Sequence, residues 1–318
     1  MLLLSLCALA QEGTLTSFDP PGSRQTVPLS INAGRSVAGY YSDGSAIHGF
    51  LRSSDGSFTV IDAPRSTATY AWSINSGGSI AGYFFAGHIF HGFLRAPNGR
   101  FIAFDPPGSI STTPQSVNSG DAVTGYYSDV NHVSHGFLRA PDGTITSFDP
   151  VGSTSTRPVS INSAGEITGF YLGSDQLDHG FVRSPGGTLT TFDVEAGQDT
   201  QPASINSSGE ITGQYGPFNE PTGFLRAADG TITKFEPVKN NDGVVPGSIN
   251  DAGYITGFYV DLRGVGHGFV RRPDGSFADF GSPAVNFVFP FSINLEGAIT
   301  GYYQASVYTT AHGFLLSP

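Results

Sequence analysis

The chain repeats one sequence unit seven times, and this repetition limits its fold more than any other feature. Each unit is about 44 residues long and contains a Ser-Ile-Asn or Ser-Val-Asn step that precedes a turn. The asparagines of this step recur at intervals of 43 or 44 residues, at Asn32, Asn75, Asn118, Asn162, Asn206, Asn250 and Asn294. A constant spacing is typical of units that stack or close on themselves, because each unit buries its apolar face against its neighbours.

The sequence pattern of each unit predicts four short β-strands. In one unit the first strand ends at Asn162, and a turn over 162–165 leads into a second strand at Glu166–Tyr171. A third strand is predicted at His135–Arg139 of the preceding unit, where an Asp-Gly turn leads into the fourth strand at Thr144–Phe148. The 43 glycines and 21 prolines interrupt the chain too often for ordinary helices. Four strands in a unit of this length match the blade of a β-propeller.

The two ends of the chain carry complementary strands. The chain opens with a fourth-strand sequence at Gly13–Asp19 and ends with a third-strand sequence at His312–Leu316. Pairing of these two strands would close a ring and remove the exposed edges of an open stack. We therefore predict an all-β, seven-bladed β-propeller with four antiparallel strands per blade, closed by pairing of the N-terminal and C-terminal strands. A single domain over residues 11–318 is expected.

The first ten residues form an apolar run that ends in Ala8-Leu9-Ala10, a pattern that signal peptidases accept. We expect residues 1–10 to be a signal peptide, complete or truncated, and the protein to be secreted, extracellular or periplasmic. Cys7 is the single cysteine, so a chain cut after Ala10 would form no disulfide. No later apolar run is long enough to cross a bilayer, and membrane insertion is not expected.

The net charge of −11, with Lys234 and Lys239 as the lysines, argues against nucleic acid and anionic membranes as partners. A glycan, peptide or protein ligand is expected instead. The sequence contains no nucleophile elbow, zinc-protease helix or phosphate-binding loop, and we expect no cofactor.

One position of the third strand is a histidine in six units and Thr222 in the other, the histidines being His48, His91, His135, His179, His267 and His312. Copies in different blades lie too far apart to share a metal ion, so no metal site is predicted. We expect these histidines to be buried and to form hydrogen bonds between blades. The aspartates that follow the fourth strands are expected to cap the adjoining Pro-Gly turns.

The repeat resembles that of bacterial extracellular proteins with HAF repeats, whose His-Ala-Phe step occurs here as His-Gly-Phe. The resemblance covers all seven units through the Asn-x-x-Gly, Gly-Tyr-Tyr and His-Gly-Phe-Leu-Arg motifs. It implies a secreted propeller-like protein. Because no settled activity is associated with that group, the resemblance assigns no catalytic residue.

Two positions beside the repeated Ser-Ile-Asn step vary among the units, although their neighbours hardly change. They are expected at the mouth of the central channel, where rings and polar side chains suit an uncharged ligand. The predicted ligand-binding residues are Tyr70, Trp72, Gln115, Arg157, Gln201, Phe289 and Phe291. The alternative that these side chains merely plug the channel carries equal weight.

Three functions remain open. The leading interpretation is a non-catalytic binding or scaffolding module that recognises a carbohydrate, peptide or protein at the channel mouth. The first alternative is a secreted lyase or hydrolase with its site there, for which the acid, base and cation candidates are Arg157, Glu195, Asp199 and Glu220. The second alternative is a purely structural surface or matrix protein. The sequence does not indicate an oligomeric state.

Overall fold

The computed structural model describes residues 13–239, 241–281, 287–306 and 309–318. All regular secondary structure assigned in this described part is β-strand. This part contains no helix that is long and apolar enough to cross a membrane. The signal peptide predicted for residues 1–10 lies outside the described residues.

Consecutive strands pair in antiparallel groups of four, and we call each group a blade. Blades 1 to 3 consist of β2 (Gln25–Ile31), β3 (Val37–Ser42), β4 (Ile47–Arg52), β5 (Phe58–Ile61), β6 (Ala68–Ile74), β7 (Ile80–Ala86), β8 (Ile89–Arg95), β9 (Phe101–Phe104), β10 (Ser111–Val117), β11 (Val123–Ser128), β12 (Ser134–Arg139) and β13 (Ile145–Phe148). The first strand of each blade is its innermost strand and the fourth is its outermost strand.

Blades 4 to 6 consist of β14 (Ser155–Ile161), β15 (Ile167–Leu172), β16 (Asp178–Arg183), β17 (Leu189–Phe192), β18 (Thr200–Ile205), β19 (Ile211–Tyr215), β20 (Thr222–Arg226), β21 (Ile232–Phe235), β22 (Val244–Ile249), β23 (Ile255–Val260), β24 (Gly266–Arg271) and β25 (Phe277–Phe280). Blade 7 combines both ends of the chain and consists of β26 (Phe287–Ile293), β27 (Ile299–Gln304), β28 (His312–Ser317) and β1 (Thr14–Phe18).

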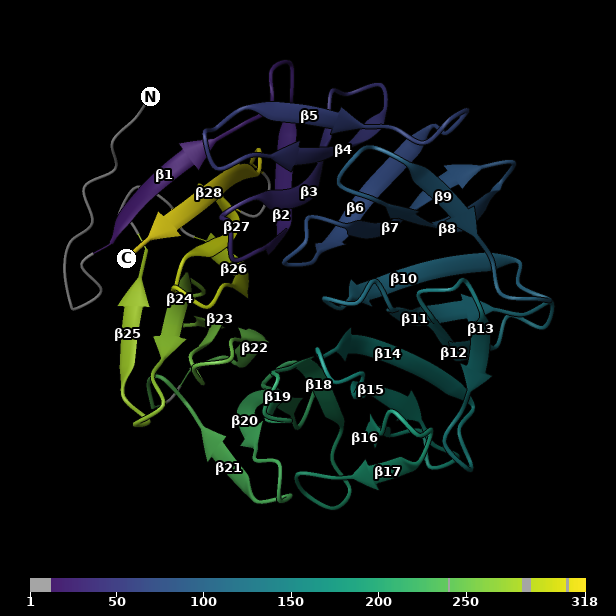
Figure 1. Ribbon diagram of the computed structural model, residues 1–318. Helices are drawn as coiled ribbons and strands as arrows, with labels where there is room; N and C mark the ends of the chain where they lie inside the picture. The colour runs from purple at the N-terminus through teal and green to yellow at the C-terminus, as the bar shows by residue number, and fades with distance from the viewer. Residues whose placement is uncertain (1–12, 240, 282–286, 307–308) are drawn as a thin grey trace.

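The blades succeed one another around a common axis (Figure 1). Each inner strand contacts the inner strand of the next blade, and β26 of blade 7 contacts β2 of blade 1. The strand β1 pairs with β28 over five residues, from Thr14 with Ser317 to Phe18 with Gly313. The fold is therefore all-β and propeller-like.

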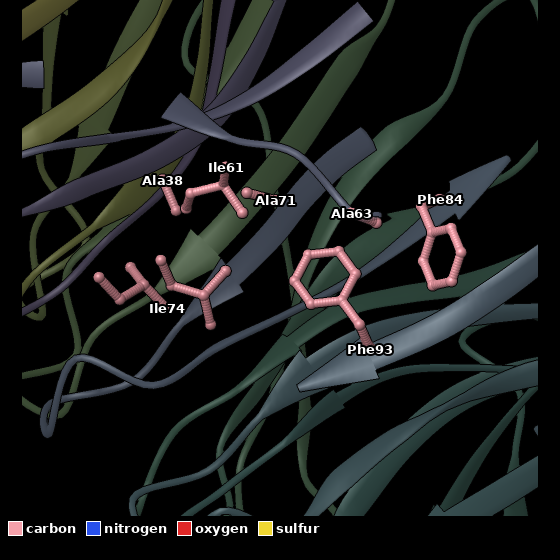
Figure 2. Packing of buried hydrophobic residues seen from close by; sticks show 8 residues of the cluster. Ala38, Ile61, Ala63, Ala71, Ile74, Phe84 and Phe93 are labelled. Atoms are coloured by element: carbon pink, nitrogen blue, oxygen red, sulfur yellow. The ribbon is translucent and has the colours of Figure 1, made fainter. Parts of the chain in front are cut away.

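Aromatic packing joins the outer parts of neighbouring blades. The phenylalanine of each His-Gly-Phe or Thr-Gly-Phe step is fully buried. Phe181 packs edge-on against Phe148 of the preceding blade, with ring centroids 6.1 Å apart, and the Arg183 guanidinium lies over the same Phe148 ring. Figure 2 shows the corresponding cluster between blades 1 and 2, where Ile61 takes the place of Phe148 beside Phe93.

Asparagine side chains join the inner parts of all neighbouring blades. In each blade the asparagine Oδ1 accepts backbone N–H groups of its own turn, as Asn206 does from Ser208 and Glu210. Its Nδ2 donates to the backbone carbonyl of the next asparagine, at 2.8–3.2 Å in the seven contacts. The last asparagine, Asn294, donates to Asn32 of blade 1.

The repeated histidine does not have the environment that the sequence predicts. Its side chain is 18–41% exposed, and its Nδ1 pairs with the aspartate that follows the fourth strand of its own blade. The prediction of a buried bond between blades was therefore wrong, because the start of the third strand lies beside the end of the antiparallel fourth strand and brings these two side chains together. The aspartate serves the histidine in five blades, a role that the turn-capping prediction missed.

His179 has a second carboxylate, since its Nε2 lies 3.1 Å from Asp175 while its Nδ1 lies 2.8 Å from Asp193. Burial alone would lower the pKa of His179, but hydrogen bonds and charge from both carboxylates outweigh burial and raise it. His48 has the same arrangement with Asp62 and Asp43, and its pKa is raised for the same reasons.

We predict that Asn206→Ala destabilises the fold by about 1–3 kcal/mol, because it leaves buried backbone groups of two blades without partners. Chemical denaturation measures the change. Ser208→Ala, which alters an exposed side chain of the same turn, is the control and should unfold like the parent. Equal stability of Asn206→Ala and the control would contradict the structural role of the asparagine.

The raised pKa of His179 predicts a pH-dependent stability. Because the folded pKa exceeds the unfolded value of about 6.5, the stabilising charge is complete below that value and is lost as pH rises through the folded pKa. The free energy of unfolding should therefore decrease as pH rises from the unfolded pKa through the folded pKa, and His179→Asn should reduce this slope. Thr190→Ala, on the exposed outer strand of the same blade, is the control. An unchanged slope in His179→Asn would refute the prediction.

Candidate functional site: the central cavity

Every inner strand contains a β-bulge at the same position. The strand register shifts between the repeated proline or alanine and the serine that follows two residues later. The bulged residues are Leu29, Trp72, Gln115, Val159, Ala203, Gly247 and Phe291. A bulge re-aims side chains, and here both the bulged residue and the following serine line the central cavity in every blade.

The second strand must approach the first closely at this point. An added Cβ at Gly213 would collide with the Gln201 carbonyl oxygen, and the equivalent glycines of the other blades are placed in the same way. Glycine in the Gly-Tyr-Tyr motif is therefore a requirement of the bulged pairing.

The hydroxyl oxygen atoms of the serines beside the bulges link neighbouring blades. Each hydroxyl accepts the backbone N–H of the isoleucine or valine in the next blade, as Ser160 does from Ile205, at 3.2–3.5 Å. Within the described chain no acceptor is assigned to the hydroxyl hydrogens of these serines. The seven hydroxyls thus remain able to donate into the cavity.

The cavity has a volume of about 740 Å³ and is lined by the inner strands of all seven blades. This volume lies within the range of about 300–1,000 Å³ that is usual for small-molecule sites. Aromatic rings, glutamine amides, serine hydroxyls and small aliphatic groups form the wall. Among the described residues, no Asp, Glu, Lys, Arg or His lines it.

The structure places four of the predicted ligand-binding residues in the cavity wall. They are Trp72, Gln115, Gln201 and Phe291, and all are partly exposed. Three of these are bulged residues, so the bulge accounts for their orientation.

The other three predicted residues pack behind or beside the wall. Tyr70 lies between two tyrosine rings, with ring centroids 4.9 Å from Tyr40 and 4.8 Å from Tyr83. Phe289 packs in the same way between Phe258 and Tyr302. The guanidinium of Arg157 lies 5.5 Å from the Tyr126 ring, and its side chain is exposed. Tyr70, Phe289 and Arg157 therefore contact aromatic rings near the cavity and do not line it themselves.

The sequence analysis missed the second-strand residues of the wall. Tyr40, Phe170 and Tyr302, which are first aromatic residues of the Gly-Tyr-Tyr steps, line the cavity. Burial, followed by the nearby Tyr70 hydroxyl, raises the pKa of Tyr40, and burial raises that of Tyr302. Gln214 occupies the same position in blade 5. It is the single non-aromatic residue among the seven copies, and that difference was visible in the sequence.

Ionisable side chains lie near the mouth but outside its wall. Asp178, at the start of β16, accepts a hydrogen bond from Gln201 Nε2 at 2.6 Å, and its own N–H donates to Asp199. Burial raises the pKa of Asp178, although the hydrogen bond from Gln201 opposes the rise. None of the four residues proposed for an enzyme lines the cavity: Arg157, Glu195 and Glu220 are exposed, and Asp199 is half-buried.

The part of the chain that the structure describes contains no group of three or more His, Cys, Asp or Glu side chains arranged to hold a metal ion.

Comparisons with known proteins identify the fold. No protein-family model matches the chain, and no curated protein matches it. A streptogramin B lyase structure superposes with a TM-score of 0.64 at 14% identity, over 95% of this chain and 97% of that one. The virginiamycin B lyase of Staphylococcus aureus gives a TM-score of 0.63 at 14% identity, over 96% and 99% of the two chains.

The β-propeller domain of the Trilobed protease from Pyrococcus furiosus gives a TM-score of 0.66 at 8% identity, over 92% of this chain and 94% of that domain. At such low identities these likenesses establish the propeller-like fold and leave the activity open.

Proposed function

We propose that this chain is a secreted, non-catalytic binding or scaffolding module that recognises an uncharged part of a carbohydrate, peptide or protein at the mouth of its central cavity. The observation that carries this proposal is the composition of the wall: rings and neutral hydrogen-bonding groups, with no ionisable side chain among the described lining residues except the tyrosines. Rings bury the apolar faces of a ligand, and amides and hydroxyls fix its orientation.

The proposal includes a closed ring of seven blades. It is supported by the pairing of β1 with β28 and by two hydrogen bonds from blade 7 to blade 1, Asn294 Nδ2 to the Asn32 carbonyl and Ile31 N–H to Ser292 Oγ. Closure removes exposed strand edges and holds the inner strands at a fixed distance from the axis. A cavity of constant shape requires such an arrangement.

Export of the protein is part of the same proposal. It rests on the apolar sequence of residues 1–10 and on the resemblance of the repeat to extracellular HAF-repeat proteins.

The enzyme alternative needs an acid or base that reaches the ligand. The four candidates suggested by the sequence lie outside the cavity wall, although Asp199 reaches the mouth indirectly through Asp178. The structural alternative needs no cavity. The binding proposal accounts for the described wall directly and is the one that we develop.

The first test concerns the wall. An array of glycans and peptides first identifies a ligand, and titration calorimetry then measures its affinity for variants. Trp72→Ala and Gln115→Ala should each lose about 1–3 kcal/mol of binding free energy, as ligand anchors do, with little change in unfolding midpoint. Arg157→Ala shows whether the ligand extends to the rim over blade 4. Normal binding by both Trp72→Ala and Gln115→Ala would mean that the wall side chains only fill the channel and bind no ligand.

The second test concerns closure. Deletion of Leu15–Asp19 removes most of β1 and exposes the edge of β28, so the unfolding midpoint of the whole domain should fall. A midpoint identical to that of the parent would indicate an open array of blades. Differential scanning calorimetry makes the measurement.

A further inference from the structure

Blade 5 breaks the pattern of the cavity wall. Where the other blades place an aromatic ring at the first position after the Gly of the second strand, blade 5 places Gln214. Gln214 Nε2 donates to Gln201 Oε1 at 2.8 Å, and Gln201 Nε2 donates to Asp178 Oδ2 at 2.6 Å. These three side chains form a polar chain from the wall of blade 5 to the edge of blade 4.

The carboxylate fixes the direction of this chain. Ionised Asp178 only accepts hydrogen bonds, so Gln201 must turn its Nε2 toward Asp178 and its Oε1 toward Gln214. Gln214 must then use its Nε2 for Gln201. The Gln214 Oε1 is thereby left as the free end of the chain. The carboxylate of Asp178 thus determines that this free end is an acceptor and not a donor.

This free acceptor has no partner in the described structure. Gln214 Oε1 is buried and accepts no hydrogen bond, although the Gln214 side chain lines the cavity. An unsatisfied buried acceptor is costly, so its presence at a cavity wall needs an explanation. The terminal torsion of a glutamine is broad, and satisfying this acceptor requires the Gln214 amide to turn until its buried Oε1 meets a donor in the cavity.

Aromatic side chains lie across the axis from blade 5. Tyr40 and Trp72, from blades 1 and 2, line the cavity there, and Figure 1 shows β3 and β6 on the opposite side from β18 and β19. The wall thus offers aromatic rings opposite the amides of Gln201 and Gln214, and a serine hydroxyl from every blade. A ligand that fits must be uncharged, flat on one face and able both to donate and to accept hydrogen bonds.

We propose that the cavity binds a neutral saccharide, with one sugar face on the rings of blades 1 and 2 and a sugar hydroxyl donating to Gln214 Oε1. A sugar hydroxyl both donates and accepts, and it can therefore satisfy Gln214 and a serine hydroxyl at the same time. The wall offers no charged side chain to a charged sugar or to the ends of a peptide. This inference rests on the proposed binding function and names the ligand class for the same site.

The test screens the full chain against a library of uncharged mono- to tetrasaccharides and a library of uncharged, end-capped tripeptides, with affinities from calorimetry. Gln214→Phe restores the aromatic side chain that other blades carry at this position, so it should fold at least as stably as the parent. It should nevertheless bind the saccharide at least about tenfold more weakly, because the acceptor is gone.

Asp178→Asn tests the direction of the chain without changing the wall. An asparagine can donate as well as accept, so both glutamines can reverse and present a donor in place of Oε1. The affinity for the saccharide should fall about fivefold or more, since the sugar hydroxyl would then have no acceptor for its own hydrogen at this position. Asp175→Asn, in the same blade but outside the chain, is the matched control and should bind like the parent.

The outcomes separate the two proposals. Saccharide binding that needs Trp72 but is unchanged in Gln214→Phe and Asp178→Asn overturns this inference and leaves the binding function intact. Binding confined to the tripeptides overturns the saccharide assignment. Binding to neither library, or saccharide binding unchanged in both Trp72→Ala and Gln115→Ala, overturns the site itself and this inference with it.

Discussion

The hydrogen bond from each asparagine to the next asparagine is the interaction on which the remaining architecture depends. One oxygen atom holds the turn between the first two strands of a blade, and one nitrogen atom of the same side chain holds the neighbouring blade. Each contact is worth little alone, but burial makes its loss expensive. The serine hydroxyls add a second set of contacts between inner strands, one step nearer to the mouth.

Because these two residues set the spacing of the inner strands, the residue between the proline and the serine is free to vary. The bulge turns it toward the axis, where it lines the cavity. The outer parts of the blades are joined separately, by rings such as Phe148 and Phe181. The scaffold and the cavity wall thus use different residues of the same strands, which lets the wall change in composition without a change in fold.

The sequence predicted the β-strands, their grouping by four and the position directly before the serine that lines the cavity, because each follows from the repeat, but three of the seven predicted ligand-binding residues lie outside the wall. It also predicted the pairing of the first and last strands that the structure contains. The histidine environment was predicted wrongly, since sequence spacing alone did not reveal that His179, at the start of the third strand, lies beside Asp193, which follows the fourth. The seven copies did indicate that the histidine and the aspartate act together, because blade 5 replaces both, with Thr222 and Glu236. The structure was needed to show that the two side chains pair.

The polar side of the cavity could not be predicted for a similar reason. Gln201 was recognised as a variable residue, but its contacts with Gln214 and Asp178 come from three different strands in two blades. A pattern search within one repeat does not detect such a chain. The rings of the Gly-Tyr-Tyr motif recur in most blades, and such recurrence fits packing within a blade as well as a wall shared by the blades.

The most direct measurement is a crystal structure of the protein with the tightest-binding saccharide of the neutral library. The account predicts the sugar in the central cavity, stacked on Trp72 or Tyr40 and with a hydroxyl within hydrogen-bond distance of Gln214 Oε1. A sugar bound on the outer rim, on the opposite face near the asparagines, or between two copies of the chain would contradict it.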